Sequence, residues 1–278
     1  MAEPFAVRLR NALDHRGPLC VGIDPSGDVM RRWDRPDDVA GLDYVARAIL
    51  EAALPVAGAV KPQVAFFERF GAAGYHVLER IIREARDASI LVIADAKRGD
   101  VGSSNVGYAE AWLGDQSPLA VDAVTESPYL GVDALGPLFS RASDAGRAVF
   151  VLAATSNDDG REIQEATTRG RVAVEVAVLR ALTSVNDRFP GEGVGGAVVG
   201  ATRSRPDFDL GLLGGPLLVP GVGAQGATLS MAHRLLNGVA PGSFLINVSR
   251  AILERGPRSS DLEDAVQRWR DDLAAVFP

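Results

Sequence analysis

Cysteine is nearly absent from this chain, which has only Cys20 among its 278 residues. A single cysteine cannot form an intramolecular disulfide, and by itself it cannot build a thiolate metal site. Because Cys20 lies in an apolar stretch, we expect it to be a small buried core residue. The low cysteine content favours a reducing compartment, and we therefore expect a cytoplasmic protein.

Long apolar runs are also missing. The longest, residues 54–60 and 89–94, fall far short of the roughly 20 residues that cross a bilayer. The first residues, MAEP, lack the basic start and apolar stretch of a signal peptide. A formal net charge of −7 argues against a nucleic-acid surface, which would be basic. We expect no membrane and no nucleic acid as partner, whereas a small anion remains compatible if basic groups gather locally.

Lysine is the second scarce residue, because only Lys61 and Lys97 among the 29 basic residues are lysines and the others are arginines. Arginine stays protonated at any working pH, whereas lysine can exchange a proton and offers a compact point charge. Two lysines in an arginine-rich chain could be an accident of composition. Their positions in the motifs below instead favour sites where an amine is needed.

Short apolar or β-branched segments recur along the chain, and each is followed by a loop and a helix-like stretch. This alternation is typical of parallel α/β proteins. We predict eight strands, at residues 18–24, 56–61, 89–95, 121–126, 148–154, 196–200, 216–220 and 243–248. Helices are predicted between them, for example at 42–54, 74–88, 169–186 and 227–237, with a last one at 262–276. Eight such units predict a (β/α)8 TIM barrel, and the lack of any linker predicts a single domain over residues 1–278.

The connection from residue 155 to residue 195 is too long to be a bare loop, so we expect it to contain its own helix. Loops that follow strands form the catalytic face of a TIM barrel. The first residues of this connection, TSNDDG at 155–160, are therefore a candidate active-site loop. A solvated turn is the alternative interpretation.

The motif DAKRGD at residues 95–100 ends the third predicted strand. Strand alternation puts Asp95 and Lys97 on the same side, and Asp100 lies just beyond them. A charged turn with solvated ion pairs is the structural alternative, but two carboxylates around one of only two lysines favour a functional site. Neighbouring carboxylates favour the ammonium form, so we expect Lys97 to be a general acid or carbanion stabiliser rather than a Schiff-base nucleophile.

Two further charged residues end the neighbouring predicted strands. Lys61 ends the second strand and Asp24 ends the first. In a barrel, the carboxyl ends of adjacent strands meet on the catalytic face. The sequence therefore predicts an alternating-charge array of Asp24, Lys61, Asp95 and Lys97.

A glycine-rich loop, PGVGAQG at residues 220–226, follows the seventh predicted strand, and Arg250 follows the eighth. Loops at these two places bind phosphate in many TIM barrels. Gly221, Gly223 and Gly226 permit close backbone approach to an anion, and Arg250 can supply a bidentate contact. A glycine-rich turn alone is more often a structural bend, but its coincidence with Arg250 predicts a phosphate site.

Taken together, these motifs resemble the orotidine 5'-phosphate decarboxylase family. The D-x-K-x-x-D pattern at residues 95–100 marks a superfamily, and its combination with Lys61, the 220–226 loop and Arg250 is specific to the decarboxylase. The letters DAKRGD, together with TSN at residues 155–157, are similar to the subgroup found in mycobacteria and some other bacteria. The resemblance covers nearly the whole predicted barrel.

The resemblance implies conversion of orotidine 5'-phosphate to uridine 5'-phosphate and CO2 without a metal or organic cofactor. It also implies a homodimer in which Asp100 reaches into the partner's active site. Lys97 is expected to protonate C6 of the pyrimidine, with Asp95 against the substrate carboxylate and Lys61 fixing the charges and contacting the ribose. The implied substrate contacts are Asp24 and Ser104 at the ribose, Ser156 at the pyrimidine, and Gln225 and Arg250 at the phosphate.

Two alternatives stay open. A magnesium-dependent sugar-phosphate aldolase or decarboxylase of the same superfamily shares the D-x-K-x-x-D pattern but carries a metal-binding Glu where this chain has Lys61, a cation that would repel magnesium. A non-catalytic nucleotide-phosphate-binding barrel would keep the cradle at residues 220–250 and perform no chemistry. The presence of Asp95, Lys97 and Asp100 argues against that second alternative.

Overall fold

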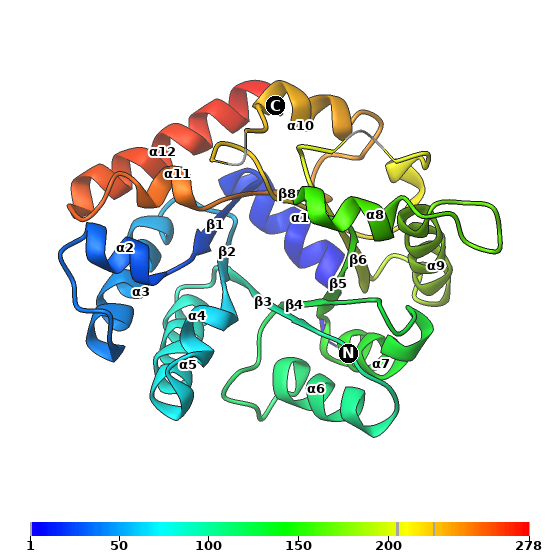
Figure 1. The fold of residues 1–278 in the computed structure, drawn as a ribbon, viewed down its shortest axis with the longest axis horizontal. Helices are drawn as coiled ribbons and strands as arrows, with labels where there is room; N and C mark the ends of the chain where they lie inside the picture. Colours follow the sequence, from blue (N-terminus) through cyan, green and yellow to red (C-terminus); the bar gives the residue numbers. More distant parts are fainter. Residues whose placement is uncertain (1, 204–205, 225, 278) are drawn as a thin grey trace.

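The computed structural model describes residues 2–203, 206–224 and 226–277. Eight parallel strands pair in sequential order, and β8 closes the barrel by pairing with β1, where Asn247 lies opposite Cys20 (Figure 1). The predicted TIM barrel is therefore confirmed. The strands are β1 (Leu19–Ile23), β2 (Ala59–Pro62), β3 (Leu91–Arg98), β4 (Ala123–Glu126), β5 (Ala148–Ala154), β6 (Gly195–Val199), β7 (Leu217–Val219) and β8 (Phe244–Val248).

Helices surround the barrel in the alternating order that the sequence predicts (Figure 1). They are α1 (Phe5–Arg16), α2 (Gly27–Arg32), α3 (Val39–Ala53), α4 (Val64–Glu68), α5 (Gly71–Asp87), α6 (Ser103–Leu113), α7 (Gly136–Ala145), α8 (Arg161–Gln164), α9 (Val174–Arg188), α10 (Leu229–Leu235), α11 (Arg250–Leu253) and α12 (Ser259–Val276). Short 3-10 turns are η1 (Asp133–Leu135), η2 (Asp158–Gly160) and η3 (Leu210–Leu212). Within the described ranges, no helix has the length and apolar character needed to cross a membrane.

Each predicted helix is confirmed, although its ends shift. The connection after β5 contains η2, α8 and α9, as its length requires. The helix predicted from residue 169 begins only at Val174, because Thr167 pairs with Ala173 across a tight turn that helical backbone could not make. Strand β2 begins at Ala59 rather than at residue 56, since the preceding residues still bond to the end of α3.

The inside of the barrel is filled by alternate side chains of the strands, as close packing of a TIM barrel requires. The inward-facing apolar residues are Cys20, Ala59, Leu91, Ile93, Ala123, Ala148, Phe150, Val198, Leu218 and Leu245, and the predicted burial of Cys20 is confirmed. Helix α1 was not among the predicted helices. It lies across one end of the barrel and adds Phe5, Leu9 and Leu13 to this core (Figure 1). The Phe5 and Phe150 rings meet edge to face at 6.2 Å.

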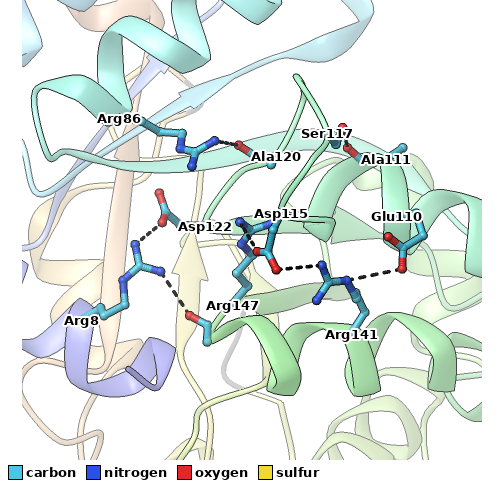
Figure 2. A network of polar contacts seen from close by, with 11 residues as sticks. Arg8, Arg86, Glu110, Ala111, Asp115, Ser117, Ala120, Asp122, Arg141 and Arg147 are labelled. Carbon is cyan, nitrogen blue, oxygen red and sulfur yellow. Dashed lines mark hydrogen bonds and ion pairs between the residues drawn. The ribbon is translucent and has the colours of Figure 1, made fainter. Parts of the chain in front are cut away.

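An ion-pair network lies at the N-terminal end of the barrel (Figure 2). Arg8 of α1 pairs with Asp122, which directly precedes β4, and Asp122 also accepts a hydrogen bond from the Val92 N–H at 2.8 Å. Asp115 accepts from Arg147 and from Arg141, each at 3.1 Å. This network joins α1 to the loops before β4 and β5. The charged motifs predicted from the sequence lie at the opposite, C-terminal end of the barrel.

Candidate active site

The two lysines of the chain meet at one carboxylate. Lys61 of β2 donates to Asp95 Oδ2 at 2.6 Å, and Lys97 Nζ donates to Asp95 Oδ1 at 2.5 Å. The Lys61 and Asp95 side chains are 5% and 10% exposed, whereas the Lys97 side chain is 42% exposed. The structure thus brings together three of the four members of the predicted array and leaves one ammonium group accessible from outside.

Mutual attraction keeps the buried part of this array charged. Burial by itself would raise the pKa of Asp95, but the ammonium groups of Lys61 and Lys97 outweigh it and hold that pKa well below its usual range. Burial would likewise lower the pKa of Lys61, yet the carboxylates of Asp95 and Asp24 raise it above the ordinary value. The Lys61–Asp95 pair is therefore ionised at neutral pH and cannot supply a neutral amine.

The backbone at Lys97 is unusual. Lys97 has a left-handed φ of 48°, and the pairing of β3 with β4 shifts register between Ala94 and Arg98. Strand β3 consequently continues to Arg98, past the predicted end at Asp95. The Thr125 hydroxyl spans this irregularity, because it accepts a hydrogen bond from the Lys97 N–H at 3.0 Å and donates to Asp95 Oδ1 at 2.9 Å.

Sequence reasoning did not single out Thr125, although a usable signal was present. Alternation within the predicted strand at residues 121–126 places Thr125 on the same face as Ala123, which lies in the inner core. A hydroxyl at the carboxyl end of an inward-facing row points into the catalytic face. Asn247 of β8 was also missed, although the same alternation places it on the inner face with Leu245. It is 9% exposed, and its Oδ1 is buried with no hydrogen-bond partner among the described residues.

Asp24 follows β1 and accepts a hydrogen bond from the Ser249 hydroxyl. A Cβ added at Gly22 would lie 2.6 Å from Ser249 Cβ, so the glycine leaves room for the serine. The second oxygen of Asp24, Oδ1, is buried and has no hydrogen-bond partner in the described part of the chain. Asp24 does not contact the lysines directly, but its charge helps to raise the pKa of Lys61, and its free oxygen can accept from a hydroxyl group.

The predicted phosphate residues lie together. Gly221, Gly223 and Gly226 all have positive φ, of 104°, 81° and 90°, so the turn needs glycine at these places. A Cβ added at Gly223 would lie 3.2 Å from the Cβ of Ala251 in α11, which places the loop against the helix that begins with the exposed Arg250. Gln225 lies outside the described residues.

The remaining predicted residues, Ser156, Ser104 and Asp100, lie beyond the ends of β3 and β5. Ser156 is half-buried, its carbonyl accepts from the Thr202 hydroxyl at 3.1 Å, and a Cβ at Gly200 would lie 2.7 Å from its Cα. Ser104 is exposed on α6. The Asp100 carboxylate accepts from the Val101 N–H at 2.8 Å, and within the described ranges no hydrogen bond or ion pair joins it to the lysines or to Asp95 of its own chain.

This geometry can be compared with known proteins. Residues 17–265 match the family model described as orotidine 5'-phosphate decarboxylase / HUMPS family. The chain belongs to this family. The conclusion agrees with the resemblance found in the D-x-K-x-x-D pattern, because the matched range contains Lys61, Asp95, Lys97 and Arg250.

Relatives named orotidine 5'-phosphate decarboxylase match along nearly their whole length. The protein from Streptomyces coelicolor is 47% identical over 272 residues, which cover 98% of this chain and 97% of the relative. That from Corynebacterium glutamicum strain R is 45% identical over 277 residues, 99% of this chain and 98% of the relative.

Solved structures agree with the family assignment. A crystal structure from Streptomyces avermitilis, 44% identical, superposes with a TM-score of 0.91 and covers 100% of this chain and 97% of its own. The Leishmania donovani OMP decarboxylase is 31% identical, with a TM-score of 0.76 and 99% of each chain covered. Orotidine 5'-phosphate decarboxylases therefore share both the fold and the extent of this chain.

Proposed function

We propose that the chain decarboxylates orotidine 5'-phosphate to uridine 5'-phosphate, with Lys97 as the proton donor. The observation that carries this proposal is the pairing of both lysines with Asp95, which leaves the Lys97 ammonium 42% exposed. When the bond between C6 and the carboxylate carbon breaks, CO2 leaves and the electron pair stays on C6. A nearby ammonium stabilises this carbanion and then transfers its proton to C6.

The phosphate end of the substrate is assigned to the glycine loop and Arg250. The exposed Arg250 guanidinium is a donor that a phosphate monoester requires, and the positive-φ residues Gly221, Gly223 and Gly226 let the loop backbone approach the anion closely. Gln225 is proposed as a further phosphate contact. Binding energy from this remote group offsets the cost of holding the substrate carboxylate beside the charged Asp95.

The other proposed substrate contacts are to the ribose and the pyrimidine. Asp24, with its unpartnered buried Oδ1, is proposed to accept from a ribose hydroxyl. Lys61 and Ser104 are proposed as further ribose contacts, and Ser156 is proposed to bind the pyrimidine. Each is a hydrogen-bonding group at a strand end or in the segment that follows a strand, where substrate contacts of TIM barrels gather.

We also propose that the reaction needs neither a metal nor an organic cofactor. The Lys61 ammonium lies 2.6 Å from Asp95 Oδ2 and occupies, at the end of β2, the place where the magnesium-dependent alternative needs an acidic ligand. The test is turnover of orotidine 5'-phosphate, followed by its ultraviolet absorbance, with and without a chelator. Turnover that is lost with chelator and restored by magnesium favours the sugar-phosphate alternative, and no turnover in either condition favours a non-catalytic barrel.

A homodimer with Asp100 acting across the interface is the further part of the proposal. Large apolar side chains surround the Asp100 loop and are exposed: Val101 (54%), Val106 (48%), Tyr129 (82%) and Leu130 (51%). The loops after β3 and β4 lie side by side, because the Ser127 N–H bonds to the Arg98 carbonyl at 2.6 Å. An apolar surface of this kind favours association, and a two-fold partner would cover it with the same surface.

Mixing two inactive variants tests the shared site. Lys97→Ala and Asp100→Ala chains each lack one group, and random exchange gives heterodimers with one site that contains both wild-type residues. We expect measurable activity after mixing, and none in matched mixtures of differently tagged Asp100→Ala chains. No recovery, despite exchange shown by the tags, means that Asp100 acts within its own chain or not at all.

We propose finally that residues 1–278 act as one domain in the cytoplasm. The closure of all eight strands into one barrel supports the single domain. The single buried Cys20 supports a reducing compartment.

A further inference from the structure

The Thr125 side chain links the Asp95 carboxylate to the backbone of Lys97, in addition to the direct bond between the Lys97 ammonium and Asp95. Its hydroxyl donates to Asp95 Oδ1 at 2.9 Å and accepts from the Lys97 N–H at 3.0 Å, and the residue is 1% exposed. A hydroxyl has one proton to donate, so the amide on one side and the carboxylate on the other fix its orientation. Thr125 thus links the carboxylate of the array to the backbone of its proton donor.

The backbone of Lys97 has need of such a link. A left-handed conformation is unfavourable for a residue with a Cβ, and Lys97 adopts it at φ 48°. The strand pairing runs from Ala94–Val124 directly to Arg98–Glu126, so the Lys97 amide has a side-chain acceptor in place of a ladder carbonyl. Packing constrains Lys97 little, because its side chain is 42% exposed.

We infer that Thr125 is a positioning residue for the reaction, an inference that rests on the proposed decarboxylation. By holding both the Lys97 amide and one oxygen of Asp95, Thr125 keeps the Lys97 ammonium beside that oxygen and directed at the substrate. Without the hydroxyl, the amide loses its acceptor and Lys97 relaxes toward an ordinary extended φ, which carries the ammonium away from C6. Substrate binding through the phosphate loop and Arg250 is unaffected, because those groups lie on β7 and β8 connections.

The experiment compares Thr125→Val, which keeps the shape and removes both hydrogen bonds, with Thr125→Ser, which keeps the hydroxyl. We expect kcat to fall about 10–100-fold in the valine variant, the scale of a misplaced catalytic group, while KM and the affinity for uridine 5'-phosphate stay within about threefold. The serine variant should keep kcat within about threefold of wild type. Thr183→Val, which removes a hydroxyl bond to the Leu179 carbonyl in α9, is the matched control and should leave kcat unchanged.

Each other outcome contradicts either the positioning role of Thr125 or the proposed decarboxylation on which it rests. An unchanged kcat in Thr125→Val overturns it, and so does a loss in which product affinity and thermal stability fall by as much as kcat, because that pattern reports damage to the fold. If the valine variant does not fold, Thr125→Ala removes the same two bonds and is judged by the same readouts. If the wild-type protein shows no turnover, the proposed function itself is overturned. If wild type and variant turn over equally, only the role of Thr125 is overturned.

Discussion

Both ends of the barrel carry ion pairs, but the basic residues in these pairs are of different types. At the C-terminal end, both lysines of the chain surround Asp95. At the N-terminal end, the bases are arginines, and Arg147 and Arg141 share Asp115 while Arg8 pairs with Asp122 (Figure 2). A guanidinium offers several directed donors and never gives up its proton, whereas an ammonium is compact and can donate one.

The pairing at the two ends also differs. Each carboxylate of the N-terminal network holds its arginines in fixed bonds, and Asp122 additionally binds the Val92 amide. At the C-terminal end one carboxylate is shared by two ammonium groups, and one of these, on Lys97, is largely open to a ligand. The comparison supports the proposal that the two lysines serve the reaction, whereas the arginines of the N-terminal network hold the fold together.

The substitution Lys97→Arg should break this distinction most strongly. It preserves the positive charge beside Asp95, so a simple ion-pair role would survive it. A guanidinium with a pKa above ~12 is a poor proton donor, and its planar head does not fit the place of an ammonium. We expect kcat to fall at least ~10³-fold in a folded protein that still binds uridine 5'-phosphate. Near-normal turnover would remove Lys97 from the role of proton donor.

The converse test is Asp122→Ala at the N-terminal end. The change leaves the buried Val92 amide without its side-chain acceptor and Arg8 without its ion-pair partner, although Arg8 keeps its bond to the Gly146 carbonyl. We expect a loss of about 3 kcal/mol in the free energy of unfolding, measured by urea denaturation, with kcat unchanged. Asp122→Asn, which can still accept from the amide, should lose less. A large fall in kcat at preserved stability would contradict a purely structural role for this end.

Arg250 is the arginine that departs from the rule, because it is exposed at the catalytic end. Arg250→Ala should reduce kcat/KM for orotidine 5'-phosphate by about 10²-fold, the equivalent of one or two charge-assisted hydrogen bonds. Orotidine, which lacks the phosphate, should be processed equally by both proteins. Arg255→Ala, an exposed arginine just beyond α11, is the control and should behave as wild type. Equal losses for both substrates would argue against a phosphate contact.

Glu126 is a buried acid that belongs to neither charged network, and it differs from the carboxylates of both because it forms no ion pair with a basic residue among those described. It is 0% exposed, neither carboxylate oxygen has a partner in the described part of the chain, and burial raises its pKa to about 8 although Arg98 opposes the shift. The folded state therefore holds a proton that the unfolded state releases near pH 4.5. Stability from this group is complete below pH 4.5 and is lost as the pH rises through about 8.

Glu126→Gln should abolish that dependence. The stability of the glutamine variant relative to wild type should rise by about 3–4 kcal/mol between pH 5 and pH 8, measured by urea denaturation at each pH. Taking the difference between the two proteins cancels the titration of the other groups. A difference that stays flat across this range would show that Glu126 is charged in the folded protein.

The sequence predicted the frame of the site well, because strand ends carry strong signals. Lys61, Asp95 and Lys97 follow apolar runs of the right length, and barrel closure then brings adjacent strand ends together. The contact between Gly223 and α11 likewise follows from loops on neighbouring strands. These features depend on local patterns and on one topological rule.

The parts that sequence could not predict depend on tertiary detail. The register shift in β3 and the left-handed backbone of Lys97 occur where Thr125 bonds across the strand pair, and no pattern in the sequence around Lys97 predicts them. Asp24 acts on the predicted array through its charge, which helps to raise the pKa of Lys61, while one of its oxygens accepts from the Ser249 hydroxyl. The role of α1 could not be predicted either, since an amphipathic segment at the start of the chain does not say which opening it covers.

Helix α1 has a consequence for how the chain is made. Phe5 packs against Phe150, and the Ala6 amide bonds to the Glu192 carbonyl at 3.0 Å, so the first helix depends on partners far along the sequence. During synthesis α1 emerges well before β5 and the segment before β6, so part of its apolar face stays uncovered until they have emerged. Helix α1 is thus made long before it is fully buried, and nascent chains halted before residue 192 expose apolar surface of the kind that aggregation and chaperones recognise.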